Sequence, residues 1–216
     1  MLALSLSGDA AAPLNVLCLG AHSDDIEIGC GGTILRLAQQ YPKCAFHWVV
    51  FSAFEARAAE ARRAAAMFAA AKAAGEPILK TFQDGFLPFA GADVKRFFED
   101  LKAKSPDLIF THNRNDAHQD HRFVAELTWN TFRNHLILEY EIPKYDGDLG
   151  QPNFFVPLEV ELCEKKVDYI MEAFESQREK RWFRRDTFLS LMRLRGVECN
   201  AASGYAEAFY SRKLVF

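Results

Sequence analysis

The sequence has no paired cysteines, no long hydrophobic run and no large excess of charge of one sign. Its five cysteines are scattered without a CxxC pair, which argues against a disulfide framework and favours reduced, mostly buried thiols. No stretch approaches the length of a membrane span, and the N-terminus lacks the basic region of a signal peptide. A formal net charge of −3 without a basic stripe argues against nucleic acid as a partner. We therefore expect a soluble, cytoplasmic protein.

Apolar runs rich in β-forming residues alternate with helical patterns along most of the chain. The strand-like runs are 15–21, 44–52, 77–82, 107–112 and 136–142, and the helical patterns between and after them are 31–41, 55–75, 92–104 and 121–133. This alternation predicts a parallel sheet with helices on both faces. The whole chain, 1–216, is expected to form a single domain, with residues 1–13 as a flexible N-terminal tail.

The pattern changes after residue 143. Residues 143–159 are rich in proline, glycine and aspartate and predict a loop that ends in a short strand. Helical patterns follow at 161–177 and 184–196, and Gly196 is expected to end the second. Basic residues between 178 and 185 alternate with acidic ones, so we interpret them as part of a solvated helix.

Polar residues gather where two of the predicted strands end. "LGAHSDDIEIGCGG", residues 19–32, follows the first strand, and "THNRNDAHQDH", residues 111–121, follows the fourth and holds three of the six histidines. Charged groups beside a buried strand are costly unless hydrogen bonds or a metal ion compensate them. Ligands of open parallel sheets bind outside the carboxyl ends of the strands, so the two segments are expected to form one site.

The residue types in these segments suit a catalytic metal. His22 and Asp25 lie three residues apart on a tight turn, and His121 can join them from the start of the following helix. Two histidines and one carboxylate are a common ligand set for catalytic zinc, with a fourth position left for water. Zn²⁺ is therefore the expected cofactor, and Fe²⁺ is the alternative.

The remaining polar residues suggest acid–base roles beside such a metal. Asp24 is placed to take a proton from the water, and His118 to stabilise an oxyanion or protonate a leaving amine. Asp120 is expected to orient one of the imidazoles. "GCGG" lacks the GxGxxG spacing of a dinucleotide site, and we interpret its glycines as a tight turn into the helix.

These motifs resemble a known family. "AHSDDIEIGCGG" is similar to the AHPDD signature of the PIG-L/LmbE-like zinc-dependent N-deacetylases, although Ser23 replaces the usual proline, and "HQDH" at 118–121 matches the HxDH element of that family. "RAAE" at 57–60, "ESQ" at 175–177 and "AEAF" at 206–209 resemble further family elements. The similarity extends along most of the chain.

The resemblance implies a fold, a reaction and roles for individual residues. The fold is a Rossmann-like three-layer α/β sandwich, and the reaction is hydrolysis of the acetamide of an N-acetylglucosamine-type sugar, free or linked to a carrier. The implied metal ligands are His22, Asp25 and His121, the general base is Asp24, the second catalytic group is His118 assisted by Asp120, and the substrate-binding residue is Arg57. The expected partner is a small N-acetylated sugar or sugar conjugate. The loop at 143–157 matches nothing in the family, so it leaves the sugar and its carrier unspecified.

Other functions stay open at this point. The same machinery could cleave a larger, non-acetyl amide, which a panel of amide substrates would reveal. A sugar-binding protein with a vestigial metal site is a second alternative, against which the complete polar set argues. A nucleotide-binding Rossmann protein is a third. The sequence does not decide between a monomer and a homo-oligomer.

Overall fold

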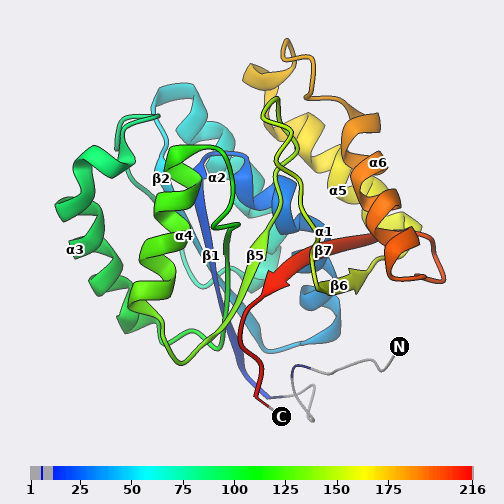
Figure 1. Ribbon diagram of the computed structural model, residues 1–216, viewed down its shortest axis with the longest axis horizontal. Helices are drawn as coiled ribbons and strands as arrows, with labels where there is room; N and C mark the ends of the chain where they lie inside the picture. Colours follow the sequence, from blue (N-terminus) through cyan, green and yellow to red (C-terminus); the bar gives the residue numbers. More distant parts are fainter. Residues whose placement is uncertain (1–5, 7–11, 216) are drawn as a thin grey trace.

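One mixed sheet organises the chain. The computed structural model describes residue 6 and residues 12–215, so most of the predicted N-terminal tail lies outside the described residues. The seven strands have the order β3-β2-β1-β4-β5-β7-β6 (Figure 1). Their bounds are β1 Leu14–His22, β2 Cys44–Ser52, β3 Ile78–Leu79, β4 Leu108–His112, β5 Leu136–Tyr140, β6 Phe154–Pro157 and β7 Ala206–Ser211. Strands β1 to β5 are parallel, whereas β7 is antiparallel to β5 and to β6.

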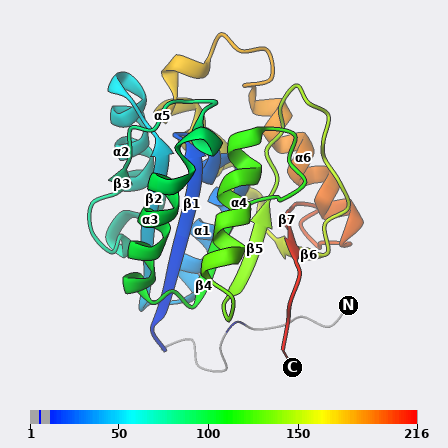
Figure 2. The same ribbon diagram turned by 60° about the vertical axis from the view of Figure 1, so that its left-hand side comes forward.

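Helices cover both faces of the sheet. The helices on one face are α1 Asp25–Gln40, α2 Glu55–Ala69, α5 Val160–Ala173 and α6 Arg185–Glu198, and those on the other are α3 Gly91–Leu101 and α4 Gln119–Thr131 (Figure 2). Alternate residues of β1 enter the two cores: Val16 and Cys18 pack on the first side, Leu17 and Leu19 on the second. Because the middle of the strand is buried on both faces, residues 16–21 are all apolar. The predicted single α/β domain with a mostly parallel sheet is confirmed.

Several predicted bounds differ from the structure. Helix α2 ends at Ala69 and not at Gly75, because Ala70 has a φ of 45° and the short helix η1, Ala70–Lys72, follows. Gly196 lies inside α6 and does not end it; a Cβ there would be 2.1 Å from the carbonyl oxygen of Gly204. The basic residues before Arg185 are exposed, as expected, but lie in turns and not in a helix. Among the helices of the described residues, none is long and apolar enough to cross a membrane.

The glycines after the first strand have a different role from the predicted one. Helix α1 begins at Asp25, before residue 31, and contains all of "GCGG". Cys30, with φ −143° and ψ 15°, kinks the helix in its middle. A Cβ at Gly29 would come 2.2 Å from the ring of Tyr140. A Cβ at Gly31 or Gly32 would likewise come too close to a side chain from another part of the chain. Close packing, and not a tight turn, therefore requires glycine here.

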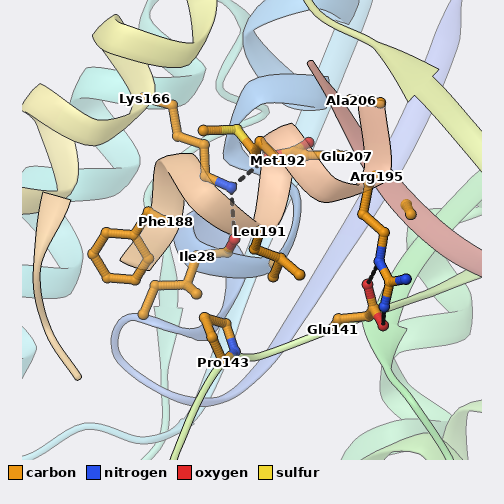
Figure 3. A pocket seen from close by; sticks show the side chains of 12 residues that line it. Ile28, Glu141, Pro143, Lys166, Phe188, Leu191, Met192, Arg195, Ala206 and Glu207 are labelled. Carbon is orange, nitrogen blue, oxygen red and sulfur yellow. Dashed lines mark hydrogen bonds and ion pairs between the residues drawn. The ribbon is translucent and has the colours of Figure 1, made fainter. Parts of the chain in front are cut away.

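A buried ion pair holds the kink of α1 from outside the helix. The carboxylate of Glu207 in β7 accepts hydrogen bonds from the backbone N–H groups of Gly32 (2.8 Å) and Thr33 (2.6 Å), which follow the kink. Lys166 in α5 donates to the carbonyl oxygen of Ile28 before the kink and to Glu207, both at 2.6 Å (Figure 3). The Lys166–Glu207 pair thus satisfies backbone groups that the interrupted helix leaves without partners.

Candidate functional site

The two polar segments meet at the carboxyl ends of β1 and β4, which are neighbours in the sheet. His22 is the last residue of β1, and Asp24 and Asp25 form the N-cap and the first residue of α1. His118 is the N-cap of α4, and His121 lies in the first turn of that helix. The parallel pairing of β1 with β4 therefore brings together residues that lie almost a hundred positions apart in the sequence.

Three potential ligand residues converge at this edge. His22 Nδ1 lies 3.1 Å from His121 Nε2 and 3.4 Å from Asp25 Oδ2, and His121 Nε2 lies 3.6 Å from Asp25 Oδ1. Ligand atoms bound to zinc at about 2.0–2.1 Å in a tetrahedron are roughly 3.3 Å apart. The spacing and the chemistry of these donors therefore fit one divalent ion.

Carboxylates lie close to the opposite nitrogens of both imidazoles. His121 Nδ1 lies 3.0 Å from Asp116 Oδ2, while His22 Nε2 lies 2.9 Å from Asp84 Oδ1 and 3.4 Å from Asp120 Oδ2. Burial raises the pKa of the Asp116 carboxyl, but the contacts with His121 outweigh it and hold this pKa below its usual value. Asp120 has a lowered pKa for a similar reason, since its contact with His22 and two backbone N–H donors offset burial. Such carboxylate–histidine pairs orient metal ligands in proteins.

His112 is buried beside the candidate ligands, although no role was predicted for it from the sequence. Its Nε2 accepts a hydrogen bond from the backbone N–H of Ala21 (2.9 Å) and lies 3.2 Å from Asp25 Oδ2. Its ring stacks on that of His121 with 3.9 Å between the centroids. Burial, together with the nearby His121, lowers the pKa of His112 to about 4, so the ring is neutral near pH 7.

The two adjacent carboxylates have different partners. Asp25 faces the histidines, whereas Asp24 Oδ1 accepts a hydrogen bond of 2.5 Å from Arg57. Arg57 also contacts Glu60 at 3.0 Å and Ser176 at 3.3 Å. Burial opposes its charge, but Asp24 and Glu60 hold the pKa of Arg57 above its usual value. Asp24 and Asp25, which are identical neighbours in the sequence, thus have different partners in the structure.

His118 lies beside both candidate ligand histidines. Its ring centroid is 4.9 Å from that of His22 and 4.6 Å from that of His121. Its Nδ1 accepts a hydrogen bond from the backbone N–H of Asp120 (3.2 Å), which leaves the proton of the neutral ring on Nε2. Burial and the two neighbouring imidazoles lower the pKa of His118, which favours this neutral form.

All seven residues predicted for the site lie at this edge of the sheet. Five of them belong to the histidine cluster and the carboxylates that contact it, whereas Asp24 and Arg57 contact each other. Sequence reasoning missed His112, Asp84 and Asp116. Asp116 belongs to the polar segment after the fourth strand and could have been singled out as one more carboxylate among histidines. Asp84 lies outside every motif, so no comparable signal pointed to it.

Comparison with known proteins agrees with this geometry. A sequence profile described as "PIG-L: GlcNAc-PI de-N-acetylase" matches residues 17–132, which is more than half of the chain. Both polar segments of the site lie inside this match.

Solved structures share the fold at low sequence identity. The N,N'-diacetylchitobiose deacetylase of Pyrococcus horikoshii has a TM-score of 0.73 at 20% identity, with 96% of this chain and 88% of that chain covered. GalB, the 4-carboxy-2-hydroxymuconate hydratase of Pseudomonas putida KT2440, has a TM-score of 0.72 at 19% identity, with 94% and 98% covered. The zinc-inhibited form of teicoplanin deacetylase Orf2 has a TM-score of 0.69 at 13% identity, with 91% and 97% covered.

These likenesses show the fold alone. A hydratase shares it with deacetylases, so the reaction has to be argued from the site. The family is shown by the profile match, which spans the histidine and aspartate motifs of the site. The chain belongs to the PIG-L family.

Proposed function

We propose that this protein is a metal-dependent N-deacetylase that hydrolyses the acetamide of an N-acetylated sugar, free or linked to a carrier. The observation that carries the proposal is the convergence of His22 Nδ1, His121 Nε2 and Asp25 within 3.6 Å of one another, next to a second carboxylate, Asp24, that contacts Arg57. The family and the deacetylases that share the fold support it.

His22, Asp25 and His121 would hold the ion, with Zn²⁺ as the proposed metal and Fe²⁺ as the alternative. When bound, a divalent cation supplies Lewis acidity, which polarises a carbonyl group and promotes ionisation of water. The protein contributes the ligand orientation: Asp116 and Asp120 face the ring nitrogens that point away from the other ligands.

Asp24 is the proposed general base. Its carboxylate is almost fully buried and bound to Arg57, so a charge that would be costly on its own is compensated in the free enzyme. We expect a polar substrate to draw Arg57 away, which leaves Asp24 free to accept the proton of the attacking water. Arg57 then binds the sugar, and Asp24 returns the proton to the departing nitrogen.

His118 is the proposed oxyanion donor. Because its Nδ1 accepts a backbone hydrogen bond, its Nε2–H is available for an oxygen that gains negative charge. The neutral ring needs no proton from solvent to do this. Proton transfer to nitrogen releases acetate and the free amine.

The proposal is tested by measuring metal content and acetate release together. Protein purified without added metal should contain about one zinc or iron per chain, and it should release acetate and amine in equal amounts from N-acetylglucosamine or a glycoside of it. Removal of the metal by a chelator should abolish the release, and zinc should restore it.

A matched pair of amides tests which acyl group the enzyme removes. N-acetyl and N-benzoyl glucosamine differ only in that group, and faster hydrolysis of the benzoyl compound would favour the amidase alternative. A stoichiometric metal with no amide hydrolysis over a broad panel would refute the proposal.

A further inference from the structure

Exposed aromatic side chains gather at one end of the molecule. Among the described residues, the exposed aromatic side chains are Phe54, Phe86, Tyr145 and Phe89, with 46%, 50%, 71% and 82% of their surface accessible. Each lies on a segment that leaves the carboxyl end of a parallel strand: β2, β3 or β5. These segments lie at the end of the molecule opposite to the two termini (Figure 1). The exposed apolar side chains of α6, by contrast, are aliphatic.

The segment that carries Phe86 and Phe89 is attached to the candidate metal site. Asp84, two residues before Phe86, has its carboxylate 2.9 Å from His22 Nε2. Leu87 is fully buried and anchors the short helix η2, Leu87–Ala90, against the core. The rings of Phe86 and Phe89 lie 5.7 Å apart and form a pair that faces solvent. The contact of Asp84 with His22 places this pair beside the site.

Tyr145 is held in the same way on the other side of the histidines. Its neighbour Lys144 contacts Asp116 Oδ2 at 3.0 Å, and the same oxygen lies 3.0 Å from His121 Nδ1. The side chain of Lys144 therefore links this segment to a carboxylate that contacts a candidate ligand. Tyr145 itself projects into solvent.

Phe54 is the fourth exposed aromatic residue and lies on the segment that follows β2. It is the N-cap residue of α2, and Arg57 lies in the first turn of that helix. Arg57 reaches Asp24 at 2.5 Å. All four rings therefore lie on segments that contact the proposed catalytic and ligand residues.

The geometry points to a binding site for an apolar group attached to the substrate sugar, formed by Phe54, Phe86, Phe89 and Tyr145, the aromatic rim. This inference rests on the proposed function, because the rim is defined relative to an acetamide at the histidine cluster. Phe86 and Phe89 are in contact, and contiguous exposed apolar patches mark binding surfaces. Aromatic rings provide a large contact area at a low cost in side-chain entropy.

The charges of the rim favour an uncharged group over a phosphate. Glu55, Asp84 and Asp146 are the exposed charged side chains next to the rings, and all are acidic. Lys144, the basic residue beside Tyr145, is already paired with Asp116 and Asp148. A phosphate bound among these side chains would face like charges.

The basic residues near 178–185 offer the alternative of an anionic carrier. Ser176 contacts Arg57, so this segment borders the same edge. Arg185, however, is paired with two acidic residues of α5, and Arg178 donates to the carbonyl oxygen of Met171. Lys180 lies over the ring of Trp182. Most of these side chains are thus engaged within their own neighbourhood.

Four substrates test the rim: N-acetylglucosamine, its hexyl and phenyl β-glycosides, and its 1-phosphate. Burial of one side of an aromatic ring or alkyl chain against the rim should raise kcat/KM for the two glycosides by about tenfold over the free sugar. The kcat/KM for the 1-phosphate should not exceed that for the free sugar. The hexyl and phenyl compounds distinguish an acyl-like carrier from an aromatic one.

Variants of the rim should remove this preference. Phe89→Ala and Phe86→Ala should each lower the ratio of kcat/KM for the hexyl glycoside to that for the free sugar by about fivefold to tenfold. Leu194→Ala, which removes an exposed side chain of α6 away from the rim, is the matched control and should leave the ratio unchanged. Equal kcat/KM for free sugar and glycosides, or a preference for the 1-phosphate, would overturn the rim while the deacetylase proposal stands.

A binding measurement separates this inference from the proposed function. If no substrate releases acetate, the deacetylase proposal fails, and calorimetry with hexyl β-glucoside, which has no acetamide, still tests the rim. Wild-type binding that Phe89→Ala weakens about tenfold supports the rim, and the absence of wild-type binding overturns it.

Discussion

Removal of the Glu207 carboxylate should destabilise the protein more than most single substitutions. Both Glu207 and Lys166 are 3% exposed at their side chains. Glu207→Ala would leave the ammonium of Lys166 with the Ile28 carbonyl as its remaining hydrogen-bond partner, and the N–H groups of Gly32 and Thr33 without an acceptor. Breaking a buried pair from one side costs about 3–5 kcal/mol. Because two buried N–H groups also lose their acceptor, we expect the free energy of unfolding to fall by at least about 4 kcal/mol.

Lys166→Met should cost less, about 2–3 kcal/mol, because Glu207 keeps its two backbone donors at the start of the second half of α1. The double variant Lys166→Met, Glu207→Ala removes both charges and should lose clearly less stability than the sum of the losses of its two single variants, with a coupling free energy of about 2 kcal/mol.

Urea unfolding of the wild type, the two single variants and the double variant gives this coupling directly. Arg195→Met, which breaks the buried pair between Arg195 and Glu141, is a control for the loss of a buried cation that makes no hydrogen bond to α1 (Figure 3). Additive losses, within about 0.5 kcal/mol, would refute the interpretation of Lys166 and Glu207 as one unit.

Three further predictions concern the site and the thiols. Asp24→Asn should retain its metal and lose activity by about 10² to 10⁴-fold, whereas Asp25→Ala should lose both, as metal analysis and acetate release would show; full activity of Asp24→Asn would end the general-base assignment. Asp116→Asn should weaken metal affinity by about 10 to 100-fold in a competition titration with a chelator, and unchanged affinity would contradict its role in orienting His121. Burial raises the pKa values of Cys44 and Cys163 to about 12, so the native protein should not react with a disulfide reagent at pH 8, whereas all five thiols should react in urea; rapid labelling of the folded protein would contradict this.

The sequence predicts the convergence of the polar segments for a simple reason. Parallel strands end at one edge of a sheet, so residues that follow β1 and β4 have to meet there once these strands are neighbours. Local patterns therefore suffice to place His22, Asp25 and His121 at the same edge of the sheet. Their role as metal ligands stays a prediction until metal content is measured.

Features that depend on long-range packing could not be predicted in this way. The pairing of Glu207 with Gly32 joins residues 175 positions apart, and no local pattern encodes it. Strand β7 pairs antiparallel to β5 and β6, so its place in the sheet did not follow from the parallel repeats before it. Asp84 reaches His22 through a loop whose path depends on its own tertiary contacts.

The glycine-rich half of α1 has a consequence for the order of folding. Each glycine lowers helix propensity by about 1 kcal/mol relative to alanine, so residues 29–32 have little tendency to form a helix alone. The groups that fix this stretch, Tyr140 and Glu207, come from the later strands β5 and β7. During synthesis the first motif therefore leaves the ribosome long before the strand that fixes its backbone. A nascent chain that ends before β7 would carry both polar motifs without a rigid site.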